Sequence, residues 1–137
     1  MATTILPWGI TPLRMHYISR PKLGTGLGRH AAVLVETLLG MFVVERQADT
    51  GARVIPLMEF EQGHVVRYER TLSDRESVAA AWRRLQAAVQ EQGYDLFGKN
   101  CEHLAREIIY GVRRSFQIEG VMLIALLLCV VLVLARE

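Results

Sequence analysis

One uncharged run near the end of the sequence constrains the fold more than any other feature. Gly120–Ala135 reads GVMLIALLLCVVLVLA, sixteen residues without a charged side chain. As a helix this run would extend about 24 Å, against about 30 Å for the hydrocarbon core of a bilayer. A buried helix of a small domain normally keeps one polar stripe, and this run has none. We therefore expect one C-terminal transmembrane helix, with a buried core helix as the alternative.

The charges that flank this run predict its orientation. Arg113 and Arg114 precede it, whereas Arg136 is the one cation that follows it. Because positive charges collect on the cytoplasmic side of a membrane, they predict a single-pass, tail-anchored protein whose main domain is cytoplasmic. The sequence then divides into a cytosolic domain over residues 1–117 and a membrane anchor over residues 118–137.

The composition of the whole chain limits the classes of protein that it can belong to. It has 137 residues, of which 51% are hydrophobic and 22% charged, and a formal net charge of +2. This length allows one domain and excludes an enzyme with a separate cofactor domain. The charge is too small to indicate nucleic acid binding, and no pattern indicates a cofactor or a metal ion. Two cysteines, Cys101 and Cys129, fit a reducing compartment rather than a disulfide framework.

The apolar pattern predicts strands first and helices afterwards. Five runs have the length and composition of strands: 15–19, 31–35, 41–45, 53–57 and 64–69. Helical spacing follows over residues 73–92, where Ser73 and Glu76 form a capping box. A second helix is expected from Cys101 to about Tyr110. This order predicts an α+β domain with a small sheet.

Cys101 is the residue best placed for chemistry. It opens the second expected helix, and the positive end of the helix dipole lowers the pKa of a thiol there. Such a nucleophile needs a base. The chain has four histidines: His16, His30, His64 and His103. His103 points to a different face of the helix from Cys101, whereas His30 precedes an apolar strand and can face a helix N-terminus. A structural cysteine without chemistry is the alternative.

Two stretches of the sequence resemble the motifs of one enzyme family. Tyr94–Ala105, YDLFGKNCEHLA, contains an Asn-Cys-Glu-His box. Upstream, Arg29–Val33 places a histidine at the start of a strand, and Met41–Glu45 is a second strand that ends in a polar residue. This pattern resembles the lecithin retinol acyltransferase (LRAT)-like family, which includes phospholipase/acyltransferases, over most of residues 12–112. The resemblance implies a circularly permuted papain-like (NlpC/P60-type) fold, with a small antiparallel sheet packed on helices.

The resemblance also implies a role for three residues. Cys101 would be the nucleophile, His30 its general base, and Glu45 the polar group that orients the imidazole. Animal members of the family usually carry a second histidine in the role of Glu45, a few residues closer to the first histidine, and often an aromatic residue where this chain has Ala31. A carboxylate can orient a histidine in other triads, so Glu45 is chemically reasonable, and Glu36 is the second candidate.

The activity that follows from the resemblance is that of a membrane-anchored thiol acyltransferase or phospholipase. It would act on lipid acyl esters through an acyl-thioester on Cys101. Its expected partners are a membrane lipid substrate and the membrane that holds the C-terminal helix, with no cofactor, metal or nucleic acid. A thiol peptidase or amidase of the NlpC/P60 type is the first alternative. A catalytically inactive, membrane-tethered interaction domain is the second.

Overall fold

The structure, a computed structural model, describes residues 9–22, 24, 28–47, 51–90, 101–111 and 116–136. The strands in these ranges are β1 (Arg14–Pro21), β2 (Arg29–Thr37), β3 (Gly40–Gln47), β4 (Gly51–Ile55) and β5 (Arg67–Leu72). The helices are α1 (Leu57–Glu61), α2 (Arg75–Gln90), α3 (Cys101–Tyr110) and α4 (Phe116–Leu134). The described part of the chain is therefore α+β, with one antiparallel sheet in the order β4-β3-β2-β1-β5.

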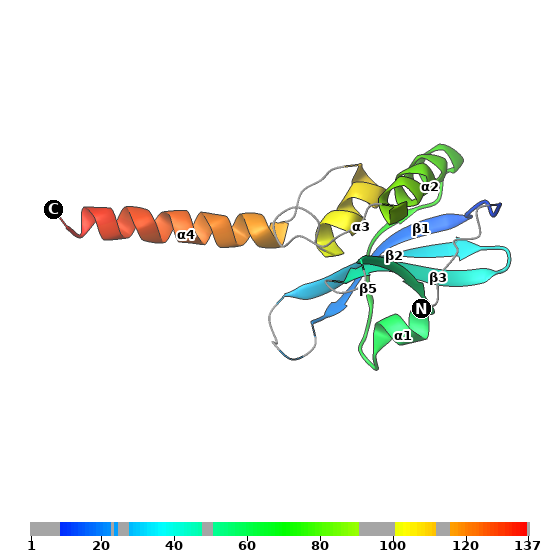
Figure 1. Cartoon of the computed structure of the whole chain (residues 1–137), viewed down its shortest axis with the longest axis horizontal. Coiled ribbons are helices and arrows are strands. Elements are labelled where there is room, and N and C mark those ends of the chain that lie inside the picture. Colours follow the sequence, from blue (N-terminus) through cyan, green and yellow to red (C-terminus); the bar gives the residue numbers. More distant parts are fainter. Residues whose placement is uncertain are drawn as a thin grey trace.

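Strand β2 lies at the centre of the sheet and is covered on both faces. Its residues Ala31, Val33 and Val35 pack with α2 and α3, whereas Ala32 and Leu34 pack with α1. Side chains alternate between the two faces of a strand, so a strand covered on both sides needs an apolar residue at every position. The unbroken apolar run of β2 follows from this position, and Figure 1 shows α2 and α3 on the face opposite α1.

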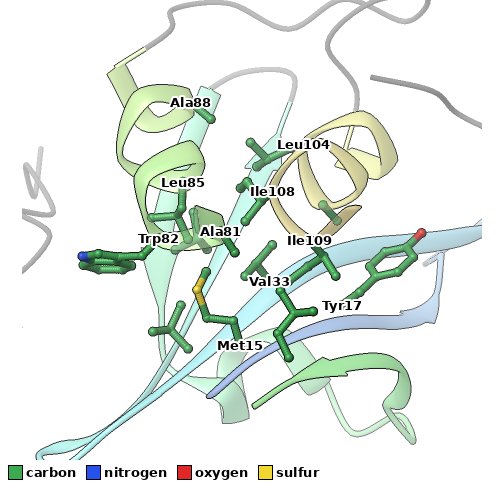
Figure 2. Packing of buried hydrophobic residues seen from close by; sticks show 14 of the residues in the cluster. Met15, Tyr17, Val33, Ala81, Trp82, Leu85, Ala88, Leu104, Ile108 and Ile109 are labelled. Carbon is green, nitrogen blue, oxygen red and sulfur yellow. The ribbon is translucent and has the colours of Figure 1, made fainter. Parts of the chain in front are cut away.

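The larger cluster of buried residues fixes α3 against the sheet. Leu104, Ile108 and Ile109 of α3 belong to one cluster with Val33 and Tyr17 of the sheet. Figure 2 shows Leu104 on the side of α3 that faces α2. Side chains of α2 complete the cluster: Ala81, Trp82, Leu85 and Ala88. This packing holds the first residue of α3, which is Cys101, near the beginning of β2.

The structure confirms three of the five predicted strands and shifts the other two along the chain by two or three residues. The runs 15–19, 31–35 and 41–45 lie inside β1, β2 and β3. The run 53–57 ends early, because Pro56 stops β4 and the short helix α1 begins at Leu57. The run 64–69 starts late: β5 begins at Arg67 and continues to Leu72.

The cap of α2 differs from the predicted capping box. The helix begins at Arg75, and the backbone N–H of Ser77 donates a 2.9 Å hydrogen bond to Oδ2 of Asp74. Asp74 therefore caps the helix in place of Ser73, since an aspartate carboxylate accepts this bond and also interacts favourably with the helix dipole. The second predicted helix agrees with α3, from Cys101 to Tyr110.

The prediction of a transmembrane helix is wrong. Among the described residues, no helix is long and apolar enough to cross a membrane. Helix α4 starts at Phe116, and its first turn contains Gln117 and Glu119 in sequence, so its uninterrupted apolar part is the fifteen residues Gly120–Leu134. At 1.5 Å per residue this part extends about 22 Å, short of a hydrocarbon core of about 30 Å. The anchor over 118–137, and the tail-anchored cytoplasmic placement derived from it, are overturned.

Candidate active site

Three elements bring Cys101, His30 and Glu45 together. Cys101 begins α3, His30 is the second residue of β2, and Glu45 lies in β3. Strands β2 and β3 run antiparallel with Val33 opposite Val44, so His30 and Glu45 fall on the same face of the sheet as diagonal neighbours. Helix α3 packs on the other face, but it begins beside the start of β2, where the Cys101 sulfur bonds to the His30 ring and to the backbone of Ala31.

The three side chains form one hydrogen-bonded array. Nε2 of His30 lies 2.7 Å from Oε2 of Glu45, and the His30 ring also forms a hydrogen bond with the thiol of Cys101. Because Nε2 is used by the carboxylate, Nδ1 is the nitrogen left for the sulfur. The backbone N–H of Ala31 donates a further hydrogen bond to the sulfur. Cys101 and Glu45 are buried, at 4% and 1% exposure, so the array is shielded from water.

The carboxylate of Glu45 is held from both sides. Its Oε1 accepts a 2.7 Å hydrogen bond from Nε of Arg53 and forms an ion pair with Nη2, while Oε2 faces His30. Burial raises the pKa of Glu45, but the hydrogen bonds from His30 and Arg53 outweigh it and hold the pKa below its usual value. Glu45 therefore stays ionised although it is buried, and its orientation is fixed by Arg53.

The thiol and the imidazole stabilise each other as an ion pair. Burial disfavours the charged form of His30, but its hydrogen bonds to Cys101 and Glu45 raise its pKa to about 9. Burial likewise raises the pKa of Cys101, and the hydrogen bond from His30 together with its charge lowers it overall. Both shifts favour a thiolate beside an imidazolium over a neutral thiol beside a neutral imidazole, and the thiolate is the reactive form of a cysteine nucleophile.

The second candidate for the orienting group, Glu36, belongs to a different cluster. Its Oε2 contacts Nε2 of His16, whose Nδ1 lies 2.7 Å from Oγ1 of Thr71. Glu36 lies near the end of β2 opposite to His30, so it cannot orient that ring. Both nitrogens of His16 are used within this cluster, which ties β5 and β2 to β1.

The other predicted residues are placed as follows. His64 is exposed in the segment between α1 and β5, away from the thiol. His103 is partly buried on α3, two residues after Cys101. Of the box that carries the family resemblance, Cys101, Glu102 and His103 lie within α3, and Tyr94–Asn100 lies outside the described residues.

Sequence reasoning missed three residues around the array. Arg53 is the Cα partner of Glu45 across strands β3 and β4. Arg20 is the Cα partner of His30 across β1 and β2. Phe60 of α1 packs against His30 and Arg20. Its ring centroid lies 5.6 Å from the centroid of the His30 ring and 5.2 Å from the guanidinium carbon of Arg20. Strand register could have identified the two arginines, but no signal in the sequence marks Phe60.

Comparisons of this chain with family models, with curated proteins and with solved structures found no match. The relationship to the LRAT-like family, and with it the permuted papain-like fold, is therefore still a prediction that depends on the two sequence motifs. The geometry of Cys101, His30 and Glu45 is independent of that resemblance, because it comes from the hydrogen bonds and burial of the residues themselves.

Proposed function

We propose that this chain is a cysteine-dependent acyltransferase or lipid hydrolase that carries an acyl group as a thioester on Cys101. The observation behind the proposal is a buried thiol bonded to an imidazole whose other nitrogen binds a carboxylate. This arrangement of nucleophile, base and orienting group is the one that thiol acyl-transfer enzymes use. The resemblance to the LRAT-like family supports lipid acyl esters as the substrate class.

The first half of the reaction forms the thioester. The Cys101 thiolate attacks the carbonyl carbon of an ester, and a C–S bond forms as the carbonyl oxygen becomes an oxyanion. The backbone N–H of Cys101 at the start of α3 can donate to that oxyanion. As the tetrahedral adduct collapses, the ester C–O bond breaks and the His30 imidazolium gives its proton to the leaving alcohol oxygen.

The second half transfers the acyl group and restores the enzyme. His30, now neutral, accepts a proton from water or from an acceptor amine or hydroxyl while that oxygen or nitrogen attacks the thioester carbonyl. The C–S bond breaks and the thiolate leaves, again paired with the imidazolium. Glu45 keeps the ring oriented in both halves. Water as acceptor gives hydrolysis, and any other acceptor gives transfer with ping-pong kinetics.

Mass spectrometry of the full-length chain tests the proposal. Cys129 is an exposed free thiol, so the starting protein carries Cys129→Ser. Incubated with phosphatidylcholine vesicles, it should gain one acyl mass on Cys101 and release the acyl chain as free acid or onto an added amine. Cys101→Ser should show neither product, and His30→Gln should form the adduct much more slowly.

The alternatives are outcomes of the same experiment. A thiol amidase would acylate Cys101 from N-acyl peptides but not from phospholipids. An inactive interaction domain would gain no mass from either substrate, and iodoacetamide would label Cys101 no faster than it labels free cysteine. If Cys101 gains no mass from either substrate and also shows only the reactivity of free cysteine, every enzymatic interpretation of the array is overturned.

A further inference from the structure

One buried cation beside the candidate site has no counterion among the residues that the structure describes. Arg20 is 5% exposed, its Nη1 donates a 3.0 Å hydrogen bond to the carbonyl oxygen of Pro21, and its Nε has no hydrogen-bond partner. Within the described parts of the chain, no carboxylate lies at ion-pair distance from its guanidinium. Removing a charge from water costs free energy unless an opposite charge compensates it. This arginine therefore lacks the partner that its burial calls for.

The position of Arg20 connects it to the reactive thiol. It lies directly opposite His30 in the register of β1 and β2. The ring of Phe60 packs against both side chains, which holds the guanidinium near the imidazole. Burial lowers the pKa of Arg20, and the nearby charges of Glu45 and Cys101 partly offset that effect.

The other charges of the site are already matched. The Cys101 thiolate is paired with the His30 imidazolium, and the Glu45 carboxylate is shared between His30 and Arg53. Arg53 also pairs with Glu59, at 3.6 Å. Among the described residues, Arg20 is therefore a buried charge at the edge of the array for which no ion pair compensates. A site with this charge distribution favours a ligand that brings a negative charge.

We propose that Arg20 binds a negatively charged group of the acyl donor, a carboxylate or a phosphate, beside the carbonyl that Cys101 attacks. The guanidinium suits this role because its planar N–H groups bind two oxygens of such a group at once, and Nε with the adjacent Nη2 forms one such edge. The inference rests on the proposed function and narrows its substrate class to anionic acyl donors.

Two alkylating reagents of similar size distinguish the effect of the reagent's charge on the alkylation rate from the effect of the reactivity of the thiol. Iodoacetate carries a carboxylate and iodoacetamide is neutral, and both react with the same sulfur. Cys101 is 4% exposed, and its charge acts on Arg20, so both reagents are expected to react close to that guanidinium. In the full-length Cys129→Ser background, Arg20→Gln should lower the rate of Cys101 alkylation by iodoacetate about tenfold. This factor corresponds to the low end of the free energy that a hydrogen bond to a charged group contributes. The rate with iodoacetamide should change by less than about twofold.

Two further variants control for net charge and for folding. Arg14→Gln removes the same charge from the same strand, but Arg14 is paired with Glu36 at the other end of β1, so both rates should stay unchanged. Arg20→Lys keeps the charge and loses the planar fork, and should slow iodoacetate by about threefold. If circular dichroism shows that Arg20→Gln does not fold, the rates of Arg20→Lys test the proposal in its place.

Competition by simple anions identifies the group and is independent of catalysis. Sodium acetate and inorganic phosphate should protect wild-type Cys101 from iodoacetamide, and raise the thermal unfolding temperature, but do neither in Arg20→Gln. Stronger protection by one of them identifies the carboxylate or the phosphate as the preferred group. Two results together would overturn the proposal. The ratio of the iodoacetate rate to the iodoacetamide rate would be the same in wild type and Arg20→Gln, and neither anion would raise the unfolding temperature of the wild type. If iodoacetamide labels Cys101 no faster than free cysteine, but the anions still stabilise the wild type and not Arg20→Gln, the proposed function is contradicted and anion binding by Arg20 is supported.

Discussion

Replacing Glu45 with glutamine tests whether a buried carboxylate sets the charge of the thiol and the imidazole. The variant keeps the size of the side chain and its ability to accept a hydrogen bond from His30, and it removes the negative charge. In the structure that charge lies 2.7 Å from Nε2 of His30, and the carboxylate is 1% exposed. The effect on His30 should therefore be large and little affected by salt.

The magnitude follows from the pKa of His30, which stands at about 9 against an ordinary value of 6.5. This difference corresponds to about 3 kcal/mol in favour of the imidazolium. Two hydrogen bonds support that form, one to Cys101 and one to Glu45, against the cost of burial. Cys101 and Glu45 together supply more than this net difference, because their hydrogen bonds and charges also offset the cost of burial. If the two residues contribute equally, Glu45→Gln removes at least half of the difference, lowers the pKa of His30 by at least about one unit, and makes the thiolate–imidazolium pair about tenfold less favourable.

The assay is the rate of iodoacetamide alkylation of Cys101 between pH 5 and 9, in the Cys129→Ser background. At pH 7 we expect Glu45→Gln to react about tenfold more slowly than the parent. Glu36→Gln is the matched control, because Glu36 makes the same kind of contact to His16 at the far end of β2. A folded Glu45→Gln protein that alkylates at the parent rate over the whole pH range would refute the reasoning and reduce the array to a dyad.

Three further predictions concern stability. Arg53→Met should lower the free energy of unfolding in urea by about 2 kcal/mol, because it leaves the buried Glu45 carboxylate with one partner fewer. His30, with its raised pKa, stabilises the fold below pH 6.5 and loses this contribution as the pH rises to about 9. Cys101, with its lowered pKa, stabilises the fold above its ordinary pKa and loses this contribution as the pH falls. The two contributions change with pH in opposite directions, so above pH 6.5 urea titrations should vary less with pH in the parent than in Cys101→Ala, where the remaining contribution of His30 declines. Leu85→Ala, at a fully buried position between α2 and the sheet, should cost roughly 3 kcal/mol by the same measurement.

The parts of the fold that could be predicted from sequence are those with a strong local pattern. The apolar run of β2 identifies a strand because burial on both faces leaves no room for polar residues. The spacing of Val78, Trp82 and Leu85 identifies α2, because one face of that helix contributes to the larger core cluster. Leu104, Ile108 and Ile109 follow Cys101 at helical spacing, so the start of a helix at Cys101 could be predicted in the same way.

Where two local signals compete, sequence alone gives no decision. Leu57 continues an apolar, strand-like run, but Pro56 ends β4 and the chain turns into α1. Ser73 and Asp74 can both cap a helix, and the choice of Asp74 depends on the backbone geometry at Ser77. The uncharged run at the end of the chain gave too strong a signal, because its helical part, Gly120–Leu134, extends about 22 Å, short of a hydrocarbon core of about 30 Å.

The electrostatic partner of Glu45 shows why the rest of the site could not be predicted. In animal members of the family that the sequence resembles, a histidine usually has this role, so a carboxylate adds a buried negative charge that costs free energy unless a cation compensates it. Arg53 supplies that cation from the next strand, directly opposite Glu45 in the β3–β4 register. The compensation therefore lies across a strand pair and outside both motifs. A reader of the sequence sees a departure from the pattern at Glu45, and only the register of the sheet shows that Glu45 and Arg53 act as one unit.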